Sequence, residues 1–174
     1  MLWVYSHKKR RAFSAIEIVV VLLILSAFST FAIVSYAGYR KQARIRNASR
    51  RLETLLTTAR ALAINHNTPY QVQIDMDNHQ FWVDRLDRFG RIEKPKAVPV
   101  DWLPDFVRVH DVVKSGLSYA SGTVSILFRP NSTSEYTSIY IISELEDEAA
   151  QENYITIRIY PSTGLVKTFR NERR

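Results

Sequence analysis

One acidic residue stands out among the side chains of this chain that could do chemistry. Glu17 follows four consecutive basic residues at positions 8–11 and directly precedes an uncharged stretch, residues 18–39. On insertion scales a charge at mid-membrane costs roughly 3 kcal/mol, whereas each aliphatic residue contributes about −0.3 to −0.6 kcal/mol. The many apolar residues therefore outweigh the single acid. The sequence predicts a helix that inserts into a bilayer with its acid near the basic end.

No catalytic constellation accompanies Glu17. The four histidines are scattered and lack the spacing of metal ligands: His7, His66, His79 and His110. Residues 75–79 (Asp-Met-Asp-Asn-His) superficially suggest a cation loop, but the later Gly and bidentate Glu of an EF-hand are missing, and a hairpin tip needs the same residue types. The sequence contains neither a phosphate-cradling Gly-rich loop nor a nucleophile elbow. We therefore predict a protein that is not an enzyme and uses no metal or cofactor.

The N-terminal pattern resembles the class III signal of type IV prepilins and type II secretion pseudopilins. In that signal a short basic leader ends in Gly, a Phe follows, and a Glu is fifth in the mature chain. Here Ala12, Phe13 and Glu17 occupy those positions. The resemblance implies that prepilin peptidase cuts between Ala12 and Phe13 on the cytoplasmic face and N-methylates Phe13. A small residue such as Ala12 still fits where the family favours Gly, with slower processing expected.

The resemblance also gives the acid a role. Glu17 is expected to pair with the N-terminal ammonium of a neighbouring subunit, so that each charge neutralises the other in lipid. Two simpler interpretations of the N-terminal segment are a secretory signal peptide and a plain single-pass anchor. The apolar run is long for a signal peptide, and neither reading gives Glu17 a purpose.

Membrane orientation follows from the resemblance rather than from charge counting. The leader carries four Lys/Arg and residues 40–51 carry six, so the positive-inside tendency does not place the N-terminus in the cytoplasm. The resemblance implies a single-pass protein of the inner membrane with its C-terminal domain in the periplasm. After processing, that protein is expected to enter a pseudopilus or pilus.

Length and composition fit one ordinary domain with its anchor. The chain has 174 residues and a formal charge of +7. Without the four basic leader residues, 20 Lys/Arg face 17 Asp/Glu, so the mature charge is only +3. This charge is weak support for a nucleic-acid partner. The absence of cysteine excludes disulfides and thiol chemistry.

A helical pattern continues beyond the uncharged stretch. Seven apolar residues fall on one helix face: Ala48, Leu52, Leu55, Leu56, Ala59, Leu62 and Ala63. One helix is predicted from Phe13 to about Asn65, where Asn-His-Asn-Thr-Pro stops it. The predicted organisation is a leader (1–12), a transmembrane or filament-core helix (13–39), its amphipathic continuation (40–66) and a globular β-rich domain (67–174).

From Tyr70 the apolar pattern changes to a period of two. Strands are predicted at 70–75, 80–85, 106–113, 123–129, 136–143, 154–160 and 165–169. Residues 86–104 are predicted to be a loop, and turns are predicted at 77–78, 130–134 and 161–164, the last two as hairpins. The predicted fold class is α+β, a pilin-like fold: a long N-terminal hydrophobic helix, transmembrane in its first half, packed on a mainly antiparallel β-sheet.

The second half of the chain is similar to the GspH/FimT-type minor pseudopilins. The similarity rests on short features: Ala59-Arg60 with Ala63, Leu103-Pro104 before a strand, Ile-Leu-Phe-Arg-Pro at 126–130, and Thr163-Gly164 between two strands. It implies a minor pseudopilin, a structural subunit of a type II secretion pseudopilus or a type IV pilus. The implied partners are other pilins or pseudopilins, prepilin peptidase, the inner membrane and secreted cargo.

Two charged clusters leave further hypotheses open. Four basic residues near the C-terminus support an alternative, a FimT-like minor pilin that binds DNA for natural transformation: Lys167, Arg170, Arg173 and Arg174. Five carboxylates lie within residues 144–152. They form a solvated loop, a contact with a basic surface of a neighbouring subunit such as the cluster in residues 40–51, or a cation site.

Overall fold

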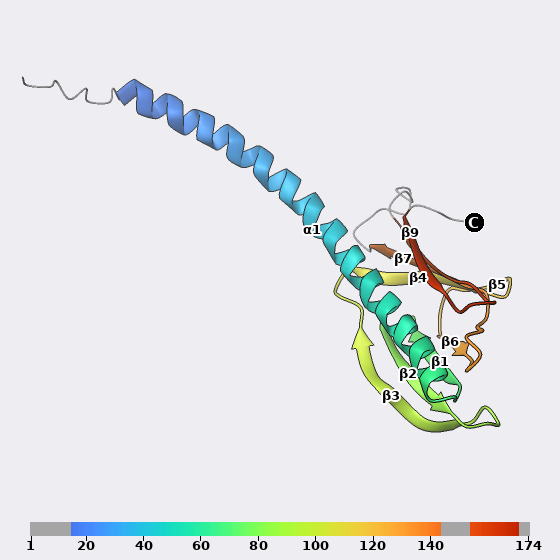
Figure 1. Ribbon diagram of the computed structural model, residues 1–174. Helices are drawn as coiled ribbons and strands as arrows, with labels where there is room; N and C mark the ends of the chain where they lie inside the picture. The colour runs from blue at the N-terminus through green and yellow to red at the C-terminus, as the bar shows by residue number, and fades with distance from the viewer. Residues whose placement is uncertain (1–14, 144–153, 171–174) are drawn as a thin grey trace, which may run out of the picture. The chain divides into compact units, whose positions relative to one another are not determined.

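The computed structural model describes residues 15–143 and 154–170 (Figure 1). The chain divides into two compact units, Met1–Arg40 and Lys41–Arg174. Helix α1 (Ala15–Asn65) provides the described part of the first unit, and its residues 41–65 belong to the second unit together with the strands. In the structure α1 begins at Ala15, and Phe13 lies outside the described residues.

The C-terminus of α1 is closed by its own backbone. Asn67 adopts a φ of 49°, and the N–H of Thr68 donates to the carbonyl oxygen of Ala63 at 3.2 Å. His66 likewise donates to the Leu62 carbonyl at 3.0 Å. These bonds satisfy carbonyls that a helix end otherwise leaves free. The predicted stop at Asn65 is confirmed.

The strands form two antiparallel sheets rather than the single sheet predicted. Sheet A has the order β3-β2-β1-β6, and sheet B has the order β5-β4-β7-β8-β9. The strands are β1 (Tyr70–Asp75), β2 (Gln80–Leu86), β3 (Ile92–Trp102), β4 (Val107–Lys114), β5 (Leu117–Tyr119), β6 (Thr123–Phe128), β7 (Thr137–Ser143), β8 (Ile155–Ile159) and β9 (Val166–Arg170). Every pairing between neighbours is antiparallel. The α+β class is confirmed.

The hairpin predicted at residues 130–134 is wrong, because β6 and β7 belong to different sheets. A tight turn does form there, with the Arg129 N–H donating to the Thr133 carbonyl at 2.9 Å. Such a turn needs only local bonds, whereas the place of a strand depends on what it must bury. Strand β7 is a central strand of sheet B, between β4 and β8, and is buried on both faces over most of its length.

Strand β3 contradicts the predicted loop at residues 86–104. Pro95 and Pro99 suggested a loop, but β3 is an edge strand that pairs only with β2, and an edge tolerates proline. The pairing contains register shifts, and Lys96 has a φ of 50°. Buried Asp84 on β2 accepts the Lys96 N–H at 2.7 Å and so holds this irregular segment. The short strand β5 was not predicted.

One hydrophobic core joins the C-terminal part of α1 to both sheets (Figure 1). The predicted helix stripe lies in this core, with Leu62 partly buried and the other six residues buried. Sheet A contributes residues such as Val72 and Phe81, and sheet B contributes residues such as Ile139 and Ile157. The amphipathic part of α1 is therefore the element that unites the two sheets, since each sheet buries an apolar face against the same core.

Candidate assembly interface

The described part of the first unit presents apolar side chains on all sides. Every large apolar residue from Ile16 to Leu25 is between 48% and 71% exposed. A helix on the surface of a soluble domain normally carries one apolar stripe, whereas a helix that is hydrophobic all round is covered by lipid or by other helices. Among the described residues, no helix combines the length and the apolar character needed to cross a membrane.

Glu17 lies on this apolar surface. Its side chain is exposed, and no hydrogen bond or ion pair reaches it from the residues that the structure describes. Its neighbours Ile16 and Ile18 are 71% and 52% exposed. Any partner that covers these residues also removes the Glu17 carboxylate from water, and a buried carboxylate needs a cation or strong donors. The arrangement can therefore form an ion pair inside a helix–helix interface. Ala12 and Phe13 lie outside the described residues.

In the second unit the same helix is already covered. Leu52 and Leu56 are fully buried, whereas Arg46, Arg50 and Thr57 on the opposite face are exposed. Polar contacts at the rim fix its position on both sheets. Arg51 donates two hydrogen bonds to the Asp101 carboxylate of β3, one of them from Nε to Oδ2 at 2.9 Å.

Sheet B is tied to the helix in the same way. The Thr168 hydroxyl of β9 donates to Glu53 Oε2 at 2.9 Å, and Arg60 Nε donates to the Thr163 carbonyl at 2.9 Å. Gly164, in the turn between β8 and β9, has a φ of 58°. A Cβ there would lie 2.5 Å from the carbonyl oxygen of Ser132 and 3.3 Å from the Arg60 side chain. The Thr163-Gly164 turn singled out in the sequence is therefore a close junction of helix, turn and inter-sheet connection.

Of the basic residues considered for DNA, the two that the structure describes do not share a face of sheet B. Lys167 lies opposite Arg158 in the ladder between β8 and β9, whereas Arg170 lies opposite the buried Ile155. Lys167 and Arg170 are three residues apart on a strand, so they point to opposite faces of sheet B. The Lys167 ammonium lies 5.9 Å from the centroid of the Tyr160 ring. Arg173 and Arg174 lie outside the described residues, as does the acidic segment 144–152.

The apparent cation loop is a hydrogen-bonded hairpin tip. Asp75 accepts the backbone N–H groups of Asp77 and Asn78 at 3.1 and 3.0 Å and the Asn78 side-chain amide at 2.8 Å. The Asn78 side chain is the chief reason that the pKa of Asp75 lies below its ordinary value. Asp77 accepts the N–H of Gly122 at 3.1 Å. In the part of the chain that the structure describes, no group of three or more His, Asp or Glu side chains could hold a metal ion.

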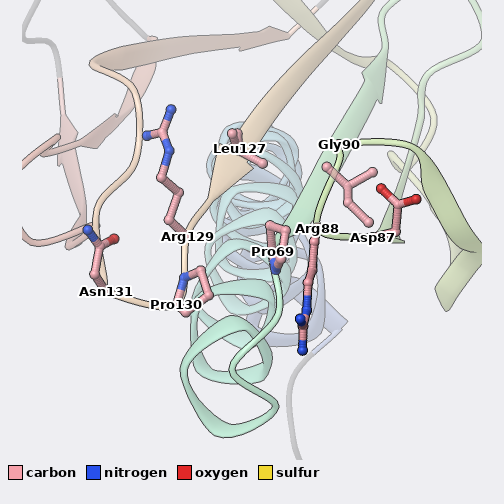
Figure 2. A pocket seen from close by; sticks show the side chains of 9 residues that line it. Pro69, Asp87, Arg88, Gly90, Leu127, Arg129, Pro130 and Asn131 are labelled. Atoms are coloured by element: carbon pink, nitrogen blue, oxygen red, sulfur yellow. The ribbon is translucent and has the colours of Figure 1, made fainter.

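The structure also shows a groove that sequence reasoning missed. Four apolar side chains line a depression of about 400 Å³, and two arginines flank it: Pro69, Leu86, Leu127 and Pro130, with Arg88 and Arg129. Figure 2 shows the two arginines on opposite sides of Pro69, with their guanidinium groups directed away from each other. No sequence signal marks this groove, because its walls come from three separated segments of the chain.

Comparison with solved structures identifies the architecture. The type IV minor pilin FimU of Pseudomonas aeruginosa matches with a TM-score of 0.55 at 13% identity, over 75% of this chain and 92% of that structure. The minor pseudopilin EpsH from the type 2 secretion system of Vibrio cholerae matches with a TM-score of 0.57 at 11% identity, over 75% of this chain and 99% of that structure.

The chain has the minor pilin fold. Neither a family profile nor a characterised protein sequence matches it, so the likeness is one of fold alone. The fold that the sequence resemblance implied is thus confirmed, and the two matches cover both the pilus and the secretion branches of that resemblance.

Proposed function

We propose that this chain is a minor pilin or pseudopilin, a structural subunit of a type IV pilus or a type II secretion pseudopilus. One observation carries the proposal. A helix whose second part is seated in a minor pilin fold carries, in its first part, apolar side chains on every side and one carboxylate among them. That surface is suited to packing with similar helices in a filament core and is unsuited to water.

Before assembly, the proposed location is the inner membrane. The uncharged stretch 18–39 has 22 residues, enough to cross a hydrocarbon core of roughly 30 Å as a helix. In this proposal residues 1–12 are the leader, 13–39 cross the membrane and later line the filament core, and 40–66 continue the helix. The globular domain, residues 67–174, then stands in the periplasm.

Processing prepares the amine that assembly uses. Prepilin peptidase removes the leader between Ala12 and Phe13 and methylates the new N-terminus. The Phe13 ammonium of one subunit then pairs with Glu17 of its neighbour in the filament. A carboxylate left alone in lipid costs roughly 3 kcal/mol, so the pair favours insertion of each new subunit in one register.

Other pilins or pseudopilins are the proposed partners, and secreted cargo is a further partner only if the host machine is a secretion system. We do not propose a role in DNA uptake, because Lys167 and Arg170 lie on opposite faces of sheet B and the mature net charge is small.

Mass spectrometry of the membrane-extracted protein tests the proposal. The expected N-terminus is Phe13 carrying one methyl group. Ala12→Gly should process at least as completely, whereas Ala12→Arg should accumulate the uncut precursor. A wild-type protein that keeps Met1, in a host whose other prepilins are cut, would refute the prepilin assignment.

A further inference from the structure

The basic cluster in residues 40–51 has no role in the proposed function. It contains six Lys/Arg, whereas the leader contains four, so by the positive-inside tendency these charges do not belong on the periplasmic side. The cluster directly follows the uncharged stretch 18–39. In the proposed function it therefore stands at the periplasmic surface of the inner membrane, where lipid phosphates are the nearest anions.

Arg44 is the first basic residue of this cluster whose side chain the structure describes. It is five residues beyond Tyr39, the last residue of the uncharged stretch, which is about 7.5 Å along a helix and at most about 18 Å along an extended chain. The headgroup layer adds about 5–8 Å to each side of the hydrocarbon core. Once residues 18–39 cross the membrane, the Arg44 guanidinium is therefore within reach of the phospholipid phosphates.

An aromatic ring is displayed beside Arg44. The Arg44 guanidinium lies 5.6 Å from the centroid of the Phe106 ring. Phe106 is 47% exposed, and its backbone has a φ of 64°. A left-handed backbone is unfavourable for a bulky side chain, and such strained positions are common in sites that bind a partner. Neither burial nor backbone preference accounts for a phenylalanine at this position.

The connection between β3 and β4 holds the Phe106 ring in place. Leu103 is buried, and its N–H donates to the His79 carbonyl at 2.8 Å. The Val107 N–H donates to the Pro104 carbonyl at 3.2 Å and closes the turn that carries Phe106. A side chain on a fixed turn loses little conformational freedom when it binds.

The charges around this ring favour an anionic surface. Residues 40–51 contain six basic residues and no acid, whereas the segment 101–106 contains two acids, Asp101 and Asp105. Asp101 accepts two hydrogen bonds from Arg51, and Asp105 is exposed. The balance is positive. Aromatic side chains beside basic ones are typical of the layer between water and hydrocarbon, where the ring lies at headgroup level and the cation binds phosphate.

We propose that the surface formed by Arg44 and Phe106 docks on anionic phospholipid headgroups of the membrane that the helix crosses. Phe106 enters the interfacial layer, and Arg44 binds a lipid phosphate. Docking holds the domain against the membrane before assembly and is released when the subunit enters the filament. The inference rests on the proposed function, because residues 18–39 must cross the membrane for the surface to reach the lipid.

A single tryptophan in the full-length chain tests the contact. Trp3, Trp82 and Trp102 are changed to Phe, and Phe106→Trp is added. The protein is reconstituted in vesicles of phosphatidylethanolamine and phosphatidylglycerol that contain lipid brominated close to the headgroup. Bromine quenches tryptophan only at short range, so the fluorescence of the Phe106→Trp chain is expected to fall. The loss should shrink at high salt and in vesicles of phosphatidylcholine alone, because the attraction is electrostatic.

Phe89→Trp in the same background is the matched control. Phe89 is 83% exposed, and its turn follows Leu86, whose N–H donates to the carbonyl of Pro69 just beyond the end of α1. The end of α1 is about 30 Å from Arg44 along the helix, so this tryptophan should not be quenched. Far-ultraviolet circular dichroism checks that both chains are folded.

Charge removal then shows whether Arg44 makes the contact. Arg44→Gln should lower the equilibrium constant for docking about fivefold, the usual contribution of one basic residue at an anionic surface. Arg88→Gln removes the same charge beside Phe89 and should leave docking unchanged.

Three outcomes overturn the proposal. The first is a Phe106→Trp chain that is quenched no more than the Phe89→Trp control, and the second is quenching that Arg44→Gln does not weaken. The third is quenching that appears only after the five carboxylates of residues 144–152 are changed to amides, because that segment rather than lipid then covers the arginine.

The proposed function is measured separately. The N-terminus at Phe13 and flotation of the full-length chain with vesicles report on processing and on insertion of the helix. A chain that is cut and inserted but not docked overturns the lipid contact and leaves the proposed function intact.

Discussion

Leu22 and Leu56 lie on the same helix, yet 60% of Leu22 is exposed and Leu56 is fully buried. The second part of α1 has one apolar stripe and a polar back, so a single domain can cover it. The first part has apolar residues on every side, and no single sheet can cover all of them. The comparison shows that the distribution of apolar residues around the helix axis decides how much of it one domain can bury, and in the proposed function the remaining apolar surface packs against other subunits.

The strongest test of this comparison changes the one acid in the first part. Glu17→Ala should still insert and be cleaved, but its incorporation into filaments should fall roughly a hundredfold, the equivalent of an unpaired charge costing about 3 kcal/mol. Immunoblots of sheared filaments and of the membrane fraction measure both quantities.

Glu53→Ala is the matched control on the same helix. Its carboxylate binds Thr168 within the subunit, so assembly should continue. Undiminished incorporation of Glu17→Ala would remove the pairing role.

Truncation of a leucine should have opposite consequences in the two parts. Leu56→Ala leaves a cavity in the core and should lower the free energy of unfolding of the domain by about 2–5 kcal/mol. Leu22→Ala removes an exposed side chain and should leave that stability unchanged. Urea unfolding in detergent, followed by tryptophan fluorescence, measures both variants. Equal losses would show that the first part also supports the domain core.

The junction at Gly164 should be nearly as sensitive as the core. Gly164→Ala combines a left-handed φ with a Cβ 2.5 Å from the Ser132 oxygen, and we expect a loss of about 2–4 kcal/mol in unfolding free energy. Gly122→Ala is the control, since Gly122 has a φ of 80° but nothing within 4 Å of the added Cβ. The excess loss at Gly164, measured by thermal unfolding, isolates the close contact with the helix and the inter-sheet connection.

The smallest effect is expected at the polar rim of the helix. Arg51→Ala breaks the two hydrogen bonds to Asp101, but the Arg51 side chain is 48% exposed. Solvent screens such a pair, so the domain should lose only about 0.2–1 kcal/mol. Asp101→Ala should cost a similar amount, and a double-mutant cycle in urea measures their coupling. A loss of unfolding free energy as large as that of Leu56→Ala would mean that the polar contacts, rather than the buried apolar residues of α1, hold the helix on the sheets.

Regular patterns explain why much of the fold could be predicted. The stripe around Leu52 and Leu56 repeats with the helical period because those positions must be buried, and β1 alternates because one face meets the core. Glu17 could be singled out because a charge inside an apolar run is conspicuous. Its pairing and the processing at Phe13 remain predictions.

Features that depend on tertiary contacts could not be predicted. Strand β3 contains the prolines that usually indicate a loop, and its irregular segment depends on Asp84 of the neighbouring strand. The division into two sheets depends on long-range strand pairing, which the turn after β6 does not determine. The groove unites Arg88 with Arg129, which are far apart in the sequence.

The irregular edge of sheet A also bears on resistance to amyloid formation. An exposed edge strand can template the addition of a strand from another molecule. Along β3, Pro95 and Pro99 lack N–H donors, and the register shifts break the even spacing of the remaining groups. An incoming strand therefore finds no continuous ladder to extend along β3. Strand addition at this edge of sheet A is therefore disfavoured.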